Sequence, residues 1–174
     1  MIEGFLNPEE ILKNNLKFLK DEIVIADFGC GSGGWVLPLA KMFPSSQIFA
    51  IDIQDEALSV LRSKAKLAKL GNVETVKANV EKSSRLKNDF CDFVLMTNLL
   101  FEVEKKESVF QEAKRVLKKE GYLLVVDWKK ETSFGPESKV EKEEVKKIAE
   151  NLGFSFKEEF EAGKYHWGMI FQKK

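Results

Sequence analysis

The sequence predicts an α/β fold in three layers, built on a mostly parallel, twisted sheet of about seven strands with a C-terminal antiparallel hairpin. Short apolar runs alternate with helical segments along most of the chain, which is typical of crossover units in a parallel sheet. Near the end of the chain, two extended runs are separated only by residues 162–165. A link this short cannot make a parallel crossover, so we expect these two strands to pair antiparallel.

The expected elements follow from apolar periodicity and from capping residues. We expect strands at residues 23–28, 47–53, 73–78, 93–97, 122–128, 154–161 and 166–172, and helices at 8–19, 35–43, 55–70, 105–118 and 141–151. Asn7 precedes Pro8 and is a helix N-cap signal. Asp55 should cap the third helix, and Gly71 should end it. The inward side of the fourth helix should consist of Val109, Phe110, Ala113, Val116 and Leu117.

Charge and composition argue against several classes of protein. The 28 basic and 28 acidic residues cancel, so no global field favours nucleic acid or an anionic membrane. The first residues lack a basic segment followed by an apolar run, and no apolar stretch approaches the ~20 residues that span a bilayer. Cys30 and Cys91 do not have metal-ligand spacing. We therefore expect a cytoplasmic protein with reduced thiols, no membrane segment and no metal.

A glycine-rich loop follows the first predicted strand and precedes a helix. It has the pattern Asp27-x-Gly29-x-Gly31-x-Gly33. Glycines at these positions let the backbone turn tightly and let a ligand approach the main chain, and the next helix would present free N–H groups to that ligand. Gly34 also completes the GxGxxG spacing of dinucleotide sites, so the glycines alone do not choose between cofactors.

Two carboxylates narrow the choice of cofactor. Asp52 ends the second strand about twenty residues later, where a carboxylate can accept both hydroxyls of a ribose. This position fits a nicotinamide dinucleotide and S-adenosylmethionine equally well. Asp27, two residues before the first glycine, can meet the ammonium of a methionine but would repel a pyrophosphate. Because the closing hairpin occupies the last residues, we also do not expect the second domain that a nicotinamide enzyme needs.

Four stretches resemble the class I S-adenosylmethionine-dependent methyltransferases, and among them the small branch similar to ubiquinone/menaquinone biosynthesis methyltransferases (type 11/25). These stretches are residues 26–33, 50–53, 91–98 and 114–127, and the resemblance extends over about residues 8–173. It implies a Rossmann-like methyltransferase fold with S-adenosylmethionine as cofactor and S-adenosylhomocysteine as product. Residues 1–174 would form one domain, with an N-terminal lid helix in 1–20 and a core in 21–174.

The resemblance also implies a cofactor site made from the ends of four strands. Its members would be Asp27, Phe28, Gly29, Cys30, Gly31, Gly33, Asp52, Ile53, Asn79, Val80, Glu81 and Asn98. Asp27 would hold the methionine end, Asp52 the ribose hydroxyls, and Ile53 would pack on the adenine. Asn79 or Glu81 would contact the adenine amino group, and the Val80 N–H a ring nitrogen. Asn98 would border the transferable methyl group.

The methyl acceptor is left open by two departures from the family. The histidine pair that often follows the fourth strand is absent, and so is the Asn/Asp-Pro-Pro-aromatic signature of amino-group methyltransferases. Phe101, Asp127 and Trp128 could line an acceptor pocket. His166, the only histidine, is a candidate general base because imidazole titrates near neutral pH, with Tyr165 beside it. The alternative for His166 is packing at a strand edge without a chemical task.

Three functions are therefore compatible with the sequence. The first is methyl transfer to a small-molecule acceptor by a monomer or homodimer, with no nucleic-acid partner expected because the charge is balanced. The second keeps the enzyme but makes the acceptor a protein or an RNA. The third is a non-catalytic module that binds S-adenosylmethionine without transferring its methyl group.

Overall fold

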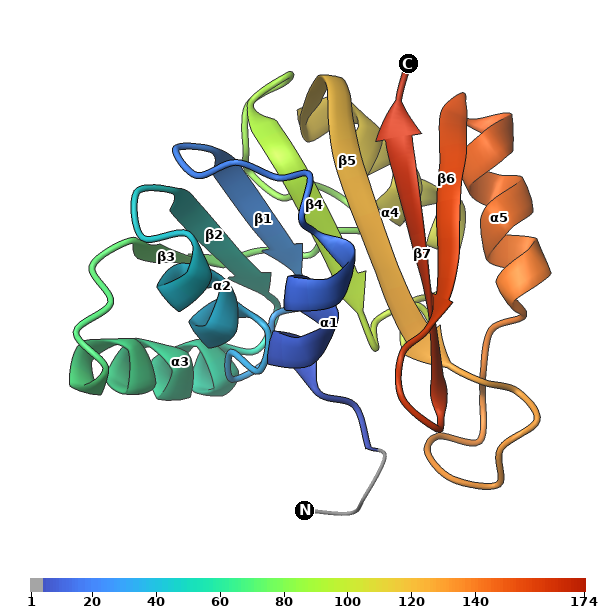
Figure 1. Ribbon diagram of the computed structural model, residues 1–174, viewed down its shortest axis with the longest axis horizontal. Coiled ribbons are helices and arrows are strands. Elements are labelled where there is room, and N and C mark those ends of the chain that lie inside the picture. The colour runs from blue at the N-terminus through green and yellow to red at the C-terminus, as the bar shows by residue number, and fades with distance from the viewer. Residues whose placement is uncertain (1–4) are drawn as a thin grey trace.

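The computed structural model describes residues 5–174 and contains a seven-stranded sheet with helices on both faces (Figure 1). In chain order the elements are α1 (Pro8–Asn15), β1 (Val24–Phe28), α2 (Val36–Met42), β2 (Gln47–Asp52), α3 (Asp55–Leu67), β3 (Val73–Lys77), β4 (Cys91–Thr97), α4 (Lys106–Val116), β5 (Leu117–Trp128), α5 (Lys142–Asn151), β6 (Phe154–Glu161) and β7 (His166–Lys173). Residues 1–4, part of the N-terminal stretch in which we expect no signal sequence, lie outside the described residues.

The strand order confirms the predicted fold class. The sheet runs β3-β2-β1-β4-β5-β7-β6. Strands β1 to β5 are mutually parallel, and β7 pairs antiparallel with both β5 and β6, so the predicted hairpin is present. The order reverses between β1 and β4, and open α/β sheets bind ligands beyond the carboxyl ends of the strands at such a point. These ends lie at the bottom of Figure 1, beside the N-terminal segment and the loop after β5.

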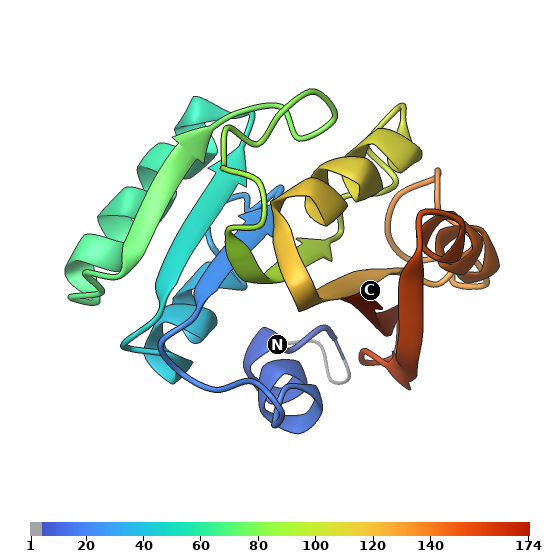
Figure 2. The same ribbon diagram turned by 90° about the horizontal axis from the view of Figure 1, so that it is seen from above.

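Alternation of side chains along the strands gives the sheet two apolar faces. One face is buried under α1, α2 and α3, where Leu12, Leu39 and Leu61 pack against sheet residues such as Ile25. The other face is covered by α4 and α5, and Phe110 of α4 belongs to that cluster. Helices α1 and α4 therefore lie on opposite sides of the sheet (Figure 2). Every sheet residue near the carboxyl edge can be assigned to one face by this alternation.

The inward face predicted for the fourth helix is confirmed, because all five of its predicted residues are fully buried. Its C-terminal boundary differs from the prediction. Helix α4 ends at Val116, and Leu117 already belongs to β5. Leu117 pairs with Cys91 before a shift in register brings Tyr122 opposite Phe93. The strand is therefore longer than its apolar run, since main-chain pairing begins in the charged segment before that run.

Three predicted helix boundaries are wrong. Helix α1 stops at Asn15, short of residue 19. Asp55 is the first residue of α3 and does not cap it; Gln54 holds the cap position, and its N–H donates to the Asp52 carboxylate (2.9 Å). Helix α3 also ends earlier than predicted, at Leu67 and not just before Gly71. Lys69 adopts a left-handed conformation (φ 55°), and the Leu70 and Lys69 N–H groups bond back into the last turn, as in a Schellman motif.

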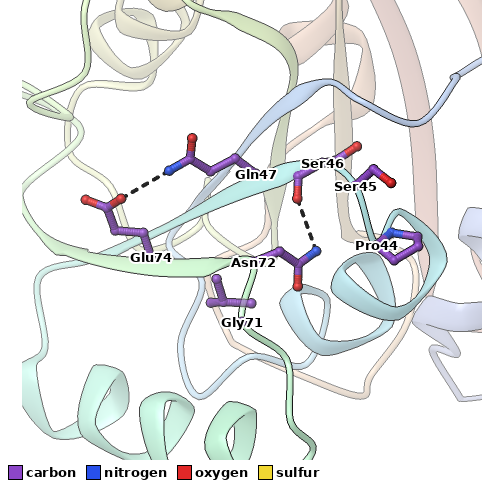
Figure 3. Close-up of a pocket in the computed structure, with 8 residues that line it drawn as sticks. Pro44, Ser45, Ser46, Gln47, Gly71, Asn72 and Glu74 are labelled. Atoms are coloured by element: carbon purple, nitrogen blue, oxygen red, sulfur yellow. Dashed lines mark hydrogen bonds between the residues drawn. The ribbon is translucent and has the colours of Figure 1, made fainter.

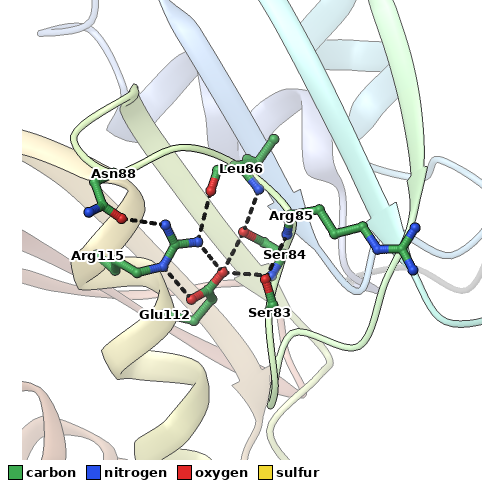
Figure 4. A network of polar contacts seen from close by, with 7 residues as sticks. All are labelled: Ser83, Ser84, Arg85, Leu86, Asn88, Glu112 and Arg115. Atoms are coloured by element: carbon green, nitrogen blue, oxygen red, sulfur yellow. Dashed lines mark hydrogen bonds and ion pairs between the residues drawn. The ribbon is translucent and has the colours of Figure 1, made fainter.

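A buried polar network fastens the segment between β3 and β4 to α4 (Figure 4). The Glu112 carboxylate accepts hydrogen bonds from the Ser84 N–H and hydroxyl, both at 2.6 Å, and from the Arg115 guanidinium at 2.6 and 2.8 Å. Arg115 also donates to the Leu86 carbonyl and to the Asn88 side chain. Burial alone would raise the pKa of Glu112, but the hydrogen bonds from Arg115 and Ser84 outweigh it and lower that pKa.

Two absences hold for the part of the chain that the structure describes. Across residues 5–174, no helix combines the length and the apolar character needed to cross a membrane. In the same range, no three His, Cys, Asp or Glu side chains lie close enough together to hold a metal ion.

Candidate cofactor and active site

A cavity of about 560 Å³ opens at the carboxyl edge of the sheet, where the strand order reverses. Segments that follow β1, β2, β3 and β4 form its walls, together with the chain before α1. The lining residues are Phe5, Leu6, Pro8, Gly29, Cys30, Gly31, Gly34, Trp35, Ile51, Asp52, Ile53, Gln54, Ala78, Asn79, Val80, Glu81, Thr97, Asn98, Leu99, Glu102 and Val103. The structure thus brings together nine of the twelve predicted cofactor residues in one cavity wall.

The glycine loop is held against the end of β2. The N–H groups of Gly29 and Cys30 both donate to the Ile51 carbonyl, at 2.8 and 3.0 Å. Gly29 and Gly31 have φ values of 74° and 51°, in the left-handed region that favours glycine. A Cβ atom built on Gly31 would meet nothing within 4 Å. Gly31 therefore presents open main chain to the cavity, where a ligand can approach the backbone.

Gly33 has a packing role that the sequence pattern does not distinguish from ligand contact. It has a φ of 92°, and a Cβ atom there would lie 2.3 Å from a methyl carbon of Leu61 on α3. Gly33 is not among the lining residues. The helix after the loop also begins later than expected, at Val36, so the loop itself and Trp35 border the cavity instead of free N–H groups of that helix.

Asp52 braces the loop from the end of β2. Its carboxylate accepts the Gly31 N–H at 2.8 Å and the Gln54 N–H at 2.9 Å, one on each oxygen. A carboxylate oxygen has two acceptor positions, so each oxygen keeps one for a ligand. The next residue, Ile53, is 59% exposed although it is apolar, and it lines the cavity. An exposed branched side chain beside a free acceptor suits a nucleoside, with its ring on the apolar surface and its sugar on the carboxylate.

Asp27 lies beneath the cavity wall and is the most unusual ionisable group of the site. It is fully buried, and neither carboxylate oxygen has a hydrogen-bond partner among the described residues. None of the ion pairs formed within residues 5–174 includes it. Burial, and secondarily the charge of Asp52, raise the pKa of Asp27 well above its ordinary value. An unpaired buried carboxylate is costly, which points to a cationic donor that completes it.

Asn98, directly after β4, is a second group with an unused acceptor. It adopts a left-handed conformation (φ 51°), which asparagine tolerates better than most residues. Its side-chain oxygen is buried without a hydrogen-bond partner among the described residues, and it lines the cavity. Uncommon backbone conformations held by the surrounding structure cluster at functional sites, so Asn98 has both the geometry and the free acceptor of a ligand contact.

The residues predicted to contact adenine are already partly engaged with one another. The Asn79 side-chain oxygen accepts the Glu81 N–H at 2.9 Å, which leaves one of its two acceptor positions free. The Glu81 carboxylate accepts the Lys105 N–H at 2.7 Å, at the start of α4. Val80 lies between them and is buried. Both alternatives for the adenine amino group therefore remain predictions.

The charge of the cavity discriminates between the two cofactors that the glycine spacing allows. Asp52, Glu81 and Glu102 line it, and among the described residues no lysine or arginine belongs to the lining. With Asp27 behind the wall, the surroundings favour a cationic ligand and oppose a pyrophosphate. The sulfonium and ammonium groups of S-adenosylmethionine fit this donor set, whereas a dinucleotide does not.

The three residues predicted for an acceptor pocket lie outside the cavity lining. Phe101 packs against the core on the α4 and α5 side of the sheet. Asp127 is fully buried and accepts the main-chain N–H groups of Leu100 and Trp128. Trp128 packs against His166, with ring centroids 4.1 Å apart. Phe28 also lies outside the lining, in the core, and the predicted contacts of these residues with ligands stay predictions.

His166 and Tyr165 belong to an aromatic cluster beside the cavity. We define the cluster as Phe5, Trp128, Phe134, Tyr165 and His166, whose neighbouring rings have centroids 4.1 to 6.5 Å apart. Phe5 belongs both to the cluster and to the cavity lining. His166 is fully buried, and neither ring nitrogen has a hydrogen-bond partner among the described residues. Burial, and then the charge of Lys129, lower the pKa of His166 to about 4, so its imidazole is neutral at physiological pH.

A second hollow, of about 450 Å³, lies at the opposite edge of the sheet (Figure 3). Its polar groups are already paired within the protein. The Asn72 amide donates to the carbonyls of Ala40, Phe43 and Ser46, and Gln47 bonds Glu74. This hollow lies at the amino ends of β2 and β3, away from the edge where α/β sheets bind ligands.

Sequence reasoning missed part of the cavity wall. Trp35, Thr97, Leu99 and Val103 line it although no motif marks them. Trp35 could have been found from its place directly after the glycine loop. Leu99 could not, because it reaches the wall by packing over Gly29: a Cβ atom on that glycine would lie 2.7 Å from a Leu99 methyl carbon.

Comparison with known proteins agrees with the fold. Residues 19–173 match the model of a methyltransferase domain family. The crystal structure of a SAM-dependent methyltransferase from Aquifex aeolicus has a TM-score of 0.88 and 31% identity, over 98% of this chain and 92% of that one. The chain is 35% identical over 101 residues to a release factor glutamine methyltransferase of Flavobacterium psychrophilum, and 33% identical over 108 residues to a ubiquinone/menaquinone biosynthesis C-methyltransferase of Pasteurella multocida.

These matches establish the family. The two alignments cover 57% and 61% of this chain but only 35% and 40% of those relatives, so the chain spans well under half of their length. The family match and the Aquifex structure cover nearly all of it. The chain belongs to the class I S-adenosylmethionine-dependent methyltransferases, in the type 11/25 branch, and it is an enzyme that uses S-adenosylmethionine as its methyl donor.

Proposed function

We propose that the protein transfers the methyl group of S-adenosylmethionine to a small-molecule acceptor. The observation that carries this proposal is the aromatic cluster beside the cavity, which supplies an apolar wall next to the cofactor residues. Ligand sites span roughly 300–1,000 Å³, so a cavity of about 560 Å³ accommodates the cofactor and only a modest further group. The acidic lining also disfavours a phosphate backbone at the site.

The residues of the chain would act mainly by holding two molecules in line. S-adenosylmethionine supplies an electrophilic methyl group on its sulfonium when bound. Asp27 and Asn98 would accept hydrogen bonds from its amino-acid end, Asp52 would hold the ribose, and Ile53 would cover the adenine. A fixed approach of the acceptor to the methyl carbon lowers the barrier by up to several kcal/mol without further chemistry. The cluster and the segment before α1 would keep water from the reacting atoms.

We propose His166 as a hydrogen-bond partner of the methyl acceptor. Its pKa of about 4 is far below the near-neutral value on which its candidacy as a general base rested, so it is a weak base and would take a proton only from an acidic group of the substrate. Its ring lies on the same face of the sheet as Asp27, because it pairs opposite Trp128 on β5. The neutral imidazole has two nitrogens without partners among the described residues. Phe5 stands next to it, with ring centroids 5.9 Å apart, so the acceptor would reach His166 past Phe5. Tyr165, stacked on Phe134, would contribute to the wall.

The experiment that tests the acceptor class is transfer of a labelled methyl group to an extract of the source organism, separated by size. We expect label in the fraction of small molecules. The control is Gly31→Val, whose side chain would enter the cavity and which should transfer nothing. Label found only in the protein or RNA fraction would overturn the proposal.

A protein acceptor is the second candidate, because one relative is by name a release factor glutamine methyltransferase. The stretch after β4 speaks against it, since residues 98–101 read Asn-Leu-Leu-Phe where that chemistry uses Asn/Asp-Pro-Pro-aromatic. The size separation distinguishes the two candidates directly.

Three further expectations are kept as proposals. One methyltransferase domain with a lid helix in residues 1–20 is supported by Leu6 and Pro8, which line the cavity. A cytoplasmic location is supported by Cys30 and Cys91, which are free thiols in the interior. A monomer or homodimer would be tested by light scattering.

A further inference from the structure

Asp127 is a buried charge that the cofactor site does not use directly. It is the next-to-last residue of β5, fully buried, and it takes part in none of the ion pairs formed within residues 5–174. Its oxygens accept two main-chain hydrogen bonds, from the Trp128 N–H at 2.8 Å and from the Leu100 N–H at 3.0 Å. The bond to Leu100 joins β5 to the segment that follows β4.

That segment, residues 98–100, forms part of the cavity wall and has an uncommon shape. Asn98 is left-handed, and its N–H donates to the Val126 carbonyl at 2.8 Å. The next side chain, Leu99, lies over Gly29 of the glycine loop. Because Leu99 lies between the Asn98 and Leu100 main-chain bonds to β5, its position over the loop depends on both of them.

Burying a carboxylate to hold a loop has a large desolvation cost. Burial raises the pKa of Asp127 to about 6, and the bonds from Trp128 and Leu100 oppose that rise. Its ionised form is the one with free acceptors for both N–H groups. A neutral side chain of the same size would avoid the cost of burying the charge, so the carboxylate is explained by the two main-chain donors that it satisfies at once.

We propose that Asp127 is a positioning residue for cofactor binding: by fixing the Leu100 N–H it holds Asn98 and Leu99 in the conformation that completes the cavity wall over the glycine loop. Asp127 acts through residues 98–100 and does not touch the cofactor. This inference rests on S-adenosylmethionine binding, which the family membership establishes, and it is independent of which acceptor is methylated.

The sheet offers a matched control at its opposite edge. Asp92, near the start of β4, also accepts a main-chain N–H from a neighbouring strand, that of Val24 at 2.9 Å, and it pairs with Lys118. Asp92→Asn makes the same chemical change as Asp127→Asn, in a clamp of the same kind far from the cavity. Both variants should lower the melting temperature, since each weakens a hydrogen bond that a carboxylate on a strand accepts from the main chain of a neighbouring segment.

The test is the dissociation constant of S-adenosylhomocysteine, measured by calorimetry. We expect Asp127→Asn to weaken binding about tenfold and Asp92→Asn by less than twofold, because only the first change reaches the cavity wall. In the Asp127→Asn protein the amide proton resonance of Leu100 should move upfield, as expected when a hydrogen bond to a carboxylate is lost. The amide of Gly31, bonded to Asp52, should change less.

Equal affinities of the two variants would overturn the proposal, and so would an unchanged Leu100 resonance. If Asp127→Asn does not fold, Asp127→Ser gives the same comparison, since its hydroxyl can accept one of the two bonds. Hydrogen exchange in the unaltered protein is a further measurement that needs no variant. The Leu100 N–H must be protected there, and rapid exchange of that proton would refute the clamp.

Discussion

Replacing Asp27 by asparagine should stabilise the protein without its cofactor and weaken cofactor binding. In the empty protein the carboxyl is fully buried without a partner among the described residues, so its charged form is penalised. Asparagine has nearly the same shape and no charge. A site that is costly without its ligand is expected where function and stability conflict.

The direction of the pH dependence follows from the raised pKa of Asp27. A carboxyl whose pKa is higher in the folded than in the unfolded protein binds more protons when folded, so its contribution to stability is lost as pH rises through the folded pKa. The advantage of Asp27→Asn should therefore grow as pH rises from the ordinary carboxyl pKa to the raised pKa of Asp27 in the folded protein. The asparagine amide is also a buried polar group, so the gain comes from the missing charge alone. It amounts to about 1.4 kcal/mol for each pH unit between the unfolded and the folded pKa of Asp27, which corresponds to roughly 3–6 °C in melting temperature for a chain of this size.

The same substitution removes the partner of the cofactor ammonium. A hydrogen bond to a charged group contributes about 1.5–3 kcal/mol, so the affinity for S-adenosylhomocysteine should fall roughly 10- to 150-fold. Calorimetry in two buffers with different ionisation enthalpies adds a sharper measurement. The unaltered protein should release protons on binding, because Asp27 ionises when the ammonium arrives, and Asp27→Asn should release fewer.

Two comparisons isolate the effect of Asp27. Methylthioadenosine lacks the ammonium, so its binding should release no protons from either protein. Asp92→Asn, at a carboxylate that is already paired, should lower the melting temperature where Asp27→Asn raises it. The reasoning fails if Asp27→Asn melts lower than the unaltered protein at alkaline pH, or binds S-adenosylhomocysteine equally well.

Three other predictions concern the polar network, the histidine and the glycine loop. Glu112→Gln should lower the free energy of unfolding by about 2 kcal/mol, because the charged hydrogen bonds to Arg115 are lost. Since the pKa of Glu112 is lowered in the folded protein, the stability that its carboxylate contributes disappears as the pH falls through that pKa. The acid unfolding curves of the two proteins should therefore converge at low pH. The imidazole of His166 should titrate with a pKa of about 4 when followed by NMR. Because this pKa is lower in the folded than in the unfolded protein, the free energy of unfolding should fall by at most about 3 kcal/mol as pH drops from 6.5 to 4. A measured pKa near 6.5 would contradict the burial of the His166 ring. Gly33→Ala should destabilise the protein by about 1–3 kcal/mol, because the new methyl group meets a side chain of α3. Compared with Gly33→Ala, Gly31→Ala should destabilise the protein less and weaken cofactor binding more. Thermal unfolding measures the first effect and calorimetry the second, and the opposite ranking of the two variants would contradict the prediction.

Local patterns in the sequence were sufficient for the fold and for nine of the residues that line the cavity. Apolar periodicity and the short link at residues 162–165 predict the parallel sheet and its terminal hairpin, because both depend on neighbouring residues. Residues at or shortly after strand ends, such as Gly31, Asp52 and Asn98, could be assigned to one edge of the sheet, since parallel strands end on the same side. That they line one cavity depends also on the strand order, which brings β1, β2 and β4 together.

Tertiary structure decided what the remaining side chains face. Asp127 lies near the end of a strand like the others, yet the pleat turns it to the α4 side, where it accepts main-chain hydrogen bonds instead of lining the cavity. His166 follows the predicted hairpin turn, but the packing of Phe5 and Trp128 determines that it is buried and neutral. Sequence spacing determines at which edge of the sheet a residue lies. The pleat of the strand and long-range packing determine which face its side chain is on, how far it is buried and whether it is protonated.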